Sequence, residues 1–173
     1  VVPAPAIGRS PASLNQTVTE GEDAPNQQFS VWNSGGGTLS YSVSENAAWL
    51  SVSPLSGTAT AETDSITVNY TTAGLAPGSP ITIIEIAAPD ATNSPQIVAV
   101  SLTVDADTDA DGVSDILDNC PYEPNPLQWD VGGVGPSSDP DGVGDVCQCG
   151  DVNDDGFVTG LDGTYVVRAA LNL

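Results

Sequence analysis

Acidic side chains alternate along residues 107–118. They occupy positions 1, 3, 5, 9 and 12 of a twelve-residue stretch: Asp107, Asp109, Asp111, Asp115 and Asp118. A hard divalent cation such as Ca²⁺ takes about six to eight oxygen ligands, and alternate side chains converge on it only where the backbone turns sharply. Gly112 at position 6 can adopt the conformation that this turn needs, and the carbonyl of Val113 at position 7 adds a ligand. A solvated acidic linker, the alternative, would explain neither the alternation nor the glycine, so we expect calcium here.

Two further stretches carry this EF-hand spacing in full or in part. Around Gly156, with the carbonyl of Phe157 at position 7, oxygen-bearing side chains again stand at positions 1, 3, 5, 9 and 12: Asp151, Asn153, Asp155, Thr159 and Asp162. In the stretch that has Gly142 at position 6, Asp139, Asp141 and Asp145 stand at positions 3, 5 and 9. Position 1 is Ser137 and position 12 is Gln148. That middle loop therefore lacks an acid at both ends unless Asp130 folds back into it. We expect the chain to bind two to three Ca²⁺ ions.

Composition excludes many other functions. The 173 residues include 23 acidic and two basic side chains, for a formal charge of -21, and no His. Arg9 and Arg168 cannot form the basic surface that nucleic acid or an anionic membrane requires, and no run of 18 apolar residues could insert into a bilayer. Without His or Lys, Ser-His catalysis, Schiff-base chemistry and His-ligated zinc are unavailable to the chain. Paired carboxylates could hydrolyse a glycosidic bond, but no Glu pair stands out, and we expect no enzyme.

Polar and apolar residues alternate through the first part of the chain, as in half-buried strands. The pattern predicts seven strands: 14–18, 28–32, 38–44, 49–53, 66–70, 81–87 and 98–104. Turns rich in Gly, Pro and Asn separate them, and no helical period occurs. Ile83 and Ile84 interrupt the alternation, which suggests a bulge. This part of the chain is expected to fold as an immunoglobulin-like β-sandwich.

Two segments of the predicted sandwich carry recognisable sequence motifs. Residues 33–41 (NSGGGTLSY) and 49–58 (WLSVSPLSGT) resemble the BACON-type immunoglobulin-like domains of secreted bacterial proteins, over about residues 10–104. The resemblance implies a sandwich and a loose link with carbohydrate or mucin binding, although a fold alone does not fix a function. Trp49 is expected to be a core residue and not a sugar-stacking platform, whereas Trp32 is open between these two roles.

Residues 105–147 resemble thrombospondin type 3 repeats, through Asp118-Asn119-Cys120-Pro121, Asn125-Pro126 and Asp145-Val146-Cys147. In that family the repeats wrap around calcium with little regular secondary structure, which adds Asn125 and Asp130 to the candidate ligands. Consecutive cysteines form disulfides in the family, so the resemblance pairs Cys120 with Cys147. Cys149 is then left over: it is free, pairs in place of Cys147, or bridges to another chain.

The last 24 residues resemble half of a dockerin, the calcium-dependent docking module of extracellular enzyme complexes. The likeness lies in Gly150 to Asn153 and in the residues that follow the loop: Tyr165, Val166, Arg168, Ala169 and Leu171. It implies a calcium loop followed by one short helix, Asp162 to Leu173. Because a dockerin pairs two such units around a small core, a single unit must find another surface for its apolar side chains.

Together these features predict a mainly β chain in three parts. They are an immunoglobulin-like sandwich (1–104), an irregular calcium-binding repeat module (105–149), and a half-dockerin-like loop with one short C-terminal helix (150–173). The cysteines favour an oxidising compartment, and Val1 is not an initiator Met, so we expect an exported, extracellular or cell-surface chain whose signal peptide has been removed.

The expected function is that of an extracellular calcium-binding structural protein, a subunit of a cell-surface or filamentous assembly. Its expected partners are copies of itself, other extracellular proteins or glycans. The alternative is a carbohydrate-binding or docking module of a secreted bacterial enzyme or adhesin.

Overall fold

A computed structural model describes residues 3–130, 140 and 142–147 of the chain. The chain divides into two compact units, Val1–Asp105 and Ala106–Leu173. The predicted C-terminal helix lies outside the described residues. Within them, no helix has the length and apolar character needed to cross a membrane.

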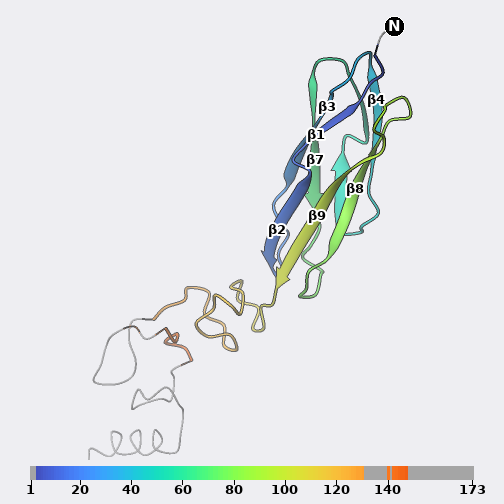
Figure 1. The fold of residues 1–173 in the computed structure, drawn as a ribbon. Coiled ribbons are helices and arrows are strands. Elements are labelled where there is room, and N and C mark those ends of the chain that lie inside the picture. Colours follow the sequence, from blue (N-terminus) through green and yellow to red (C-terminus); the bar gives the residue numbers. More distant parts are fainter. Residues whose placement is uncertain (1–2, 131–139, 141, 148–173) are drawn as a thin grey trace, which may run out of the picture. The chain divides into compact units, whose positions relative to one another are not determined.

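The first unit is a two-layered β-sandwich (Figure 1). Its strands, in chain order, are β1 (Ile7–Ser10), β2 (Ser13–Thr19), β3 (Gln27–Asn33), β4 (Leu39–Ser44), β5 (Leu50–Ser53), β6 (Ser56–Ala59), β7 (Thr63–Tyr70), β8 (Ile81–Ala87) and β9 (Gln96–Asp105). One sheet has the order β1-β3-β7-β5 and the other β2-β9-β8-β4-β6. β2 and β9 pair in parallel, and the other neighbours are antiparallel.

Alternation along the strands produces the core. In β4 every second side chain is buried and the side chains between them face solvent, and β5 follows the same pattern. The inward side chains of both sheets form one apolar cluster, which includes Leu14, Phe29, Val31, Leu39, Ile66, Val68, Ile84, Ile86, Val98, Val100 and Leu102. Burial of these side chains is the main stabilising contribution to the sandwich. The predicted immunoglobulin-like sandwich is confirmed.

Two strands were not predicted, and one predicted irregularity is absent. β1 (IGRS) and β6 (SGTA) lack the alternation of large apolar with polar side chains by which β5 (LSVS), of the same length, was predicted. The bulge expected at Ile83 and Ile84 was wrong, because β8 pairs with β9 in continuous register from Ile81 to Ile86. Ile83 instead points outward and is 47% exposed.

Side chains close the edge of the sandwich at β1. The Asn93 amide bonds to both backbone groups of Ile7, accepting from its N–H (2.8 Å) and donating to its carbonyl (2.9 Å). The Arg9 guanidinium crosses to the other sheet, where it donates to the carbonyl of Ile97 and to Gln96 Oε1 (2.7 Å). Groups that would otherwise be free to pair with another strand are thereby satisfied within the sandwich.

Aromatic residues make contacts within one sheet and between the two sheets. Trp49 packs against the core and stacks on Tyr70, with 6.3 Å between the ring centroids, which confirms its predicted core role. The buried Tyr41 on β4 donates to Asp64 Oδ2 on β7 (2.7 Å). Gly57 leaves room for this pair, because a Cβ there would overlap the Tyr41 hydroxyl.

A buried threonine joins two loops at one end of the sandwich. Thr72 Oγ1 accepts from the Ala24 N–H (2.8 Å) and donates to the Glu22 carbonyl (3.0 Å). Asp23 completes the arrangement by accepting from the Thr72 and Ala73 N–H groups at 2.6 and 2.9 Å. Since Thr72 and Ala24 are both buried, water cannot replace these bonds.

Replacing Thr72 with Val should destabilise the sandwich by about 1–3 kcal/mol, because the variant keeps the shape but leaves the Ala24 N–H buried without an acceptor. Urea unfolding would measure the loss. Thr71→Val is the matched control: Thr71 is exposed and its described bond to Trp49 is through the backbone, so its effect should stay within about 0.5 kcal/mol. Equal effects of the two substitutions would contradict the structural role given to Thr72.

Candidate metal centre

Carboxylates fold the loop that begins at Asp107 around itself. Asp107 accepts from the N–H groups of Asp111 (3.2 Å) and Gly112 (3.0 Å), and Asp111 accepts from Val113 N–H (2.8 Å). Gly112 has a φ of 93°, a conformation that favours glycine, as the sequence required at position 6. These bonds turn successive acidic side chains toward one point.

Three of the predicted ligands meet there. Each of Asp107, Asp109 and Asp111 offers a carboxylate oxygen, and these oxygens lie within 4.8 Å of one another. Asp107 is buried, and in the described part of the chain Asp109 Oδ2 and Asp118 Oδ2 are buried without a hydrogen-bond partner. A buried carboxylate oxygen without a donor is costly, and a cation removes that cost. The residues present therefore fit a hard divalent ion.

Asn125 reaches the same place from further along the chain. Its backbone N–H donates to Asp111 Oδ2 (2.7 Å). One end of its side-chain amide lies 3.1 Å from Asp118 Oδ1 and 3.3 Å from Asp111 Oδ2. If the amide nitrogen faces this point it donates to both carboxylates; if the oxygen faces it, Asn125 becomes a further oxygen ligand. The Asn125 side chain can therefore donate hydrogen bonds to the carboxylates when no ion is present, or offer its oxygen to an ion.

The pKa values of Asp109 and Asp115 are shifted in opposite directions. The pKa of Asp109 is raised, chiefly because its carboxyl loses water and then because the negative charge of Asp111 is near. The pKa of Asp115 is lowered by hydrogen bonds from Thr108, whose hydroxyl and N–H both donate to it at 2.7 Å. Asp115 thus faces Thr108 and lies outside the group of three, and its part in binding an ion stays a prediction.

Gln128 is a supporting residue that the ligand spacing did not indicate. Its side chain donates to Asp118 Oδ1 (2.8 Å) and accepts from the Asn119 N–H (2.8 Å). A turn closed by the Gln128 N–H and the Asn125 carbonyl (2.7 Å) directs it back toward these residues. Asn-Pro dipeptides commonly mark turns, so Asn125-Pro126 was the one feature of the sequence from which this position could have been found.

A second acidic loop repeats part of the first. Asp130 Oδ2 accepts from the Gly142 N–H (2.8 Å), as Asp107 Oδ2 accepts from Gly112, and Gly142 has a φ of 89°. Asp130 therefore stands to Gly142 as the first acid of a loop, the position that counting assigned to Ser137. Asp139 and Asp141 lie outside the described residues, and so does the whole third set: Asp151, Asn153, Asp155, Phe157, Thr159 and Asp162.

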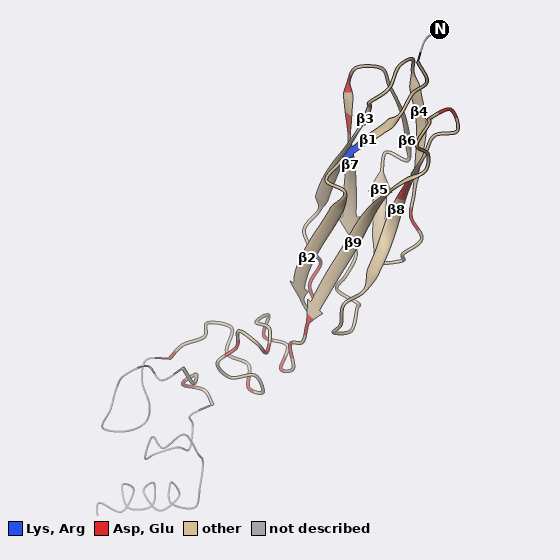
Figure 2. Cartoon of the chain, in the orientation of Figure 1, with Lys and Arg blue, Asp and Glu red and all other residues tan. Residues whose placement is uncertain are grey.

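A disulfide joins the two loops. Cys120 and Cys147 are bonded, with 5.6 Å between their Cα atoms, which confirms the predicted pairing; Cys149 lies outside the described residues. Gly144 packs directly beside the bridge, where a Cβ would overlap Asn119 Oδ1, Cys120 Sγ and Asn125 Nδ2. The bridge and the ligand candidates thus share one tightly packed region. Figure 2 shows acidic residues recurring along residues 106–130.

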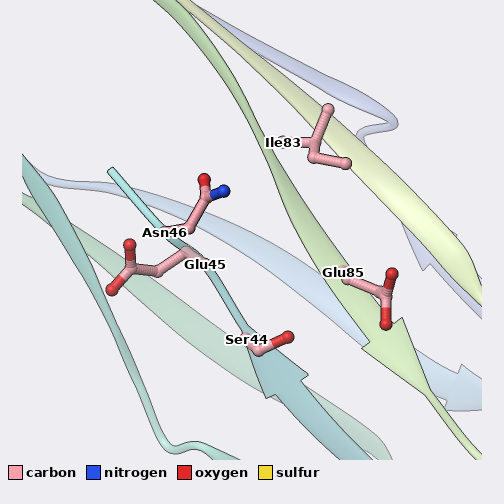
Figure 3. Close-up of a pocket in the computed structure, with 5 residues that line it drawn as sticks. All are labelled: Ser44, Glu45, Asn46, Ile83 and Glu85. Carbon is pink, nitrogen blue, oxygen red and sulfur yellow. The ribbon is translucent and has the colours of Figure 1, made fainter. Parts of the chain in front are cut away.

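The sandwich offers a second group of acids, in a shallow pocket of about 170 Å³. Ser44, Glu45 and Asn46 at the end of β4 and Ile83 and Glu85 on β8 line it (Figure 3). Glu45 Oε2 accepts from the Ala47 N–H (2.9 Å), and in Figure 3 its carboxylate points away from that of Glu85. The two do not form the facing pair that glycoside hydrolysis uses.

Comparison with solved structures finds the sandwich elsewhere. A protein of unknown function from Porphyromonas gingivalis W83 matches with a TM-score of 0.51 and 16% identity over 60% of this chain and 50% of its own. A PapD-like domain of human CEP192 matches with a TM-score of 0.44 and 12% identity over 58% and 86%. A Bacteroides ovatus GH5 xyloglucanase matches with a TM-score of 0.44 and 10% identity over 57% and 19%. At such identities the likeness concerns the fold alone, and this chain spans half or less of the first and third proteins. No curated protein matches the sequence.

Family models divide the chain where the structure does. A model of the thrombospondin type 3 repeat matches residues 104–128, which contain the loop of Asp107 and Asn125. The model described as the viral BACON domain matches residues 6–105, all nine strands of the sandwich. The chain therefore belongs to the BACON domain family and carries a thrombospondin type 3 repeat directly after that domain.

Proposed function

We propose that this chain is an extracellular calcium-binding structural protein that serves as a building block of a cell-surface or filamentous assembly. The observation that carries the proposal is the convergence of Asp107, Asp109 and Asp111, with buried oxygens of Asp109 and Asp118 that lack a donor in the described residues. Asn125 completes a set made of oxygens alone, the ligand type that Ca²⁺ prefers.

Calcium would order the second unit. Residues 106–147 contain ten acidic and no basic side chains, and Cys120 is the one buried apolar side chain in the part that the structure describes. Such a segment gains little from hydrophobic burial, so bonds to two or three ions would supply its stability. The loop of Asp130 and Gly142 is the proposed second site, and Asp151 to Asp162 the third.

The same features support an extracellular location. A disulfide persists in oxidising compartments, and BACON domains and thrombospondin type 3 repeats are modules of extracellular proteins. Calcium outside cells is abundant enough to fill sites with a Kd of about 0.1–1 mM. A structural role is also favoured because the chain lacks His and Lys and the acids of the β4–β8 pocket do not face each other.

Calorimetry in millimolar calcium should find at least two Ca²⁺ per chain. Asp111→Ala should remove one of them and leave the sandwich folded, because Asp111 is a proposed ligand and also holds the Asn125 N–H. Asp90→Ala, which removes an exposed acid from the loop between β8 and β9, should keep the full number. Fewer than two ions per chain, or the same loss in both variants, would contradict the proposal.

The proposed assembly rests on a different observation from calcium binding, and a different experiment tests it. The second unit exposes several large apolar side chains among its acids, and such surfaces commonly mark contacts with other proteins: Ile116, Leu117, Tyr122, Leu127 and Trp129. Sedimentation of protein purified from its source should show species larger than a monomer in millimolar calcium, and monomers after EDTA. A single monomeric species at high concentration in calcium would contradict assembly while leaving calcium binding intact.

A second candidate function is glycan binding by the outer face of the β1-β3-β7-β5 sheet. Trp32 lies across Gly8, where a Cβ would overlap Cε2, Nε1 and Cδ2 of the indole, so one ring face is against the backbone. Its outward neighbours in the register carry hydroxyl or amide groups: Ser10, Gln28, Ser30, Ser51, Ser53, Thr63, Ser65, Thr67 and Asn69. In these strands the face carries no charge, which suits a neutral sugar ring stacked on the indole.

Retention on insoluble cellulose, chitin and mannan would test this candidate. The chain should bind at least one of them, and Trp32→Ala should weaken that binding about tenfold, since the stacking surface is lost. Trp129→Ala, which removes the exposed tryptophan of the other unit, is the control and should bind as the parent chain does. Failure to bind all three polymers, or equal binding by both variants, would set the candidate aside.

A further inference from the structure

The strands at the borders of the two sheets differ in length and in protection. Three of them, β1, β5 and β6, have four residues each, whereas β2 (Ser13–Thr19) has seven. In Figure 1, β2 lies at the border of its sheet, with β9 as its neighbour on one side. Its sequence, SLNQTVT, contains no charged residue and no Pro, two features by which proteins commonly protect an edge strand. A long, uncharged edge strand is suited to pair with another strand.

Alternate backbone groups of β2 face the open side of the sheet. At the two ends of the strand, the Ala12 carbonyl accepts from β9 (3.0 Å) and the Glu20 N–H donates to β9 (2.8 Å), so the even-numbered residues bond to β9. The backbone groups of Asn15 and Thr17 therefore point the other way. In the described residues the Asn15 carbonyl accepts from the Gln27 side chain (3.1 Å), and neither the Asn15 N–H nor the two backbone groups of Thr17 are bonded.

The side chains of β2 follow nearly the same order from either end. From the centre at Gln16 outward, the strand has a polar, an apolar and a hydroxyl residue on each side: Asn15 and Thr17, Leu14 and Val18, Ser13 and Thr19. The apolar pair is buried on the inner face, and the polar pair is exposed on the outer face. A second β2 laid antiparallel, Gln16 opposite Gln16, places apolar side chains opposite apolar ones and polar opposite polar.

We infer that β2 pairs antiparallel with β2 of a second copy of the chain, centred on Gln16, so that one sheet runs through both sandwiches. In this register Asn15 lies opposite Thr17 of the partner subunit, and their outward N–H and carbonyl groups exchange hydrogen bonds. The same bonds recur across the two-fold axis, as in other contacts in which a surface meets its own copy. The inference deepens the proposed assembly, on which it rests, by naming a contact between its subunits.

One side chain leaves its place when the strands pair. The Gln27 amide that donates to the Asn15 carbonyl lies where the N–H of the second copy arrives. That bond is exposed, so another donor can replace it at little cost in free energy. Gln27 keeps its other bond, in which its side-chain oxygen accepts from the Tyr70 hydroxyl (2.7 Å). Gln27 therefore covers part of the edge in the single chain without closing it.

Charge also favours β2 as the contact. Two chains of formal charge -21 repel each other, and the repulsion is smallest where the touching surfaces carry no acid. A contact made by one pair of edge strands is small and reversible. Because bound calcium would lower the charge of each chain, we expect the pair in millimolar calcium and its separation by EDTA. An unrelated extended peptide could form the same backbone bonds, but it would lack the mirrored order of side chains.

Sedimentation velocity of the full chain in millimolar calcium tests the inference. Thr17→Pro should weaken self-association at least tenfold, because it removes an outward N–H and keeps the bonds to β9. Thr17→Val is the matched control: it keeps that N–H and nearly the same volume, so its self-association should stay within about twofold of the parent's. Urea unfolding of both variants shows whether the sandwich is intact.

Two charged variants identify the occupant and decide the matter alone if Thr17→Pro unfolds the sandwich. One carries Lys at both positions (Asn15→Lys, Thr17→Lys) and the other carries Glu (Asn15→Glu, Thr17→Glu). Each should self-associate at least tenfold more weakly than the parent, because like charges then face each other across the axis. An equal mixture should form heterodimers, since each Lys then faces a Glu of the other chain.

The outcomes separate this contact from the proposed assembly. A parent chain that stays monomeric in calcium would overturn both. Larger species in the parent that Thr17→Pro leaves unchanged in a folded sandwich would overturn the β2 contact alone. Charged variants that associate no better when mixed than when kept apart would do the same.

Discussion

Repulsion between carboxylates is the constraint on which the second unit depends. Ten acids and no base lie within residues 106–147, and the fold brings Asp107, Asp109 and Asp111 together when dispersal would cost less. Loss of water and then the like charge of Asp111 both favour the protonated form of Asp109, and the pKa of that carboxyl is raised. A divalent cation would reverse the sign of the interaction, and the turn at Gly112, the inward amide of Asn125 and the packing at Gly144 would then all serve one centre.

Hydrophobic burial, and not metal binding, orders the sandwich. Its stability comes from an apolar cluster shared by two sheets, and its few charged side chains satisfy particular backbone or side-chain groups: Arg9 reaches β9, Asp23 holds the loop at Thr72, and Asp64 accepts from Tyr41. Because those bonds are internal, they should depend little on salt or calcium. Removal of calcium is therefore expected to destabilise the second unit and to leave the sandwich almost unchanged.

Much of this could be predicted from the sequence, and the exceptions have physical causes. Alternation located seven strands because one face of each is buried, whereas β1 and β6 do not alternate large apolar with polar side chains. Trp49 was assigned to the core correctly. The bulge predicted at Ile83 and Ile84 was wrong, because an exposed Ile in a regular strand gives the same sequence pattern as a bulge.

The proposed metal centre was predictable where its candidate ligands are close in sequence. Position counting found Asp107, Asp109 and Asp111, but it cannot detect that Thr108 holds Asp115 by local hydrogen bonds. Counting also assumes that a loop is contiguous, which is why it assigned Ser137 to the place of Asp130. Gln128 was missed because it supports other side chains and has no ligand spacing of its own.

The hydrogen bond between Asp130 and Gly142 bears on how much sequence the second loop can contain. It joins the start of a loop to its glycine across eleven intervening residues, where Asp107 and Gly112 are separated by four. Both loops have the same carboxylate-to-glycine hydrogen bond and a similar φ at the glycine, although their lengths differ. The second loop therefore tolerates additional sequence between its first acid and its glycine, and natural variation or an engineer's peptide could be accommodated at this point without redesign of the unit that presents it.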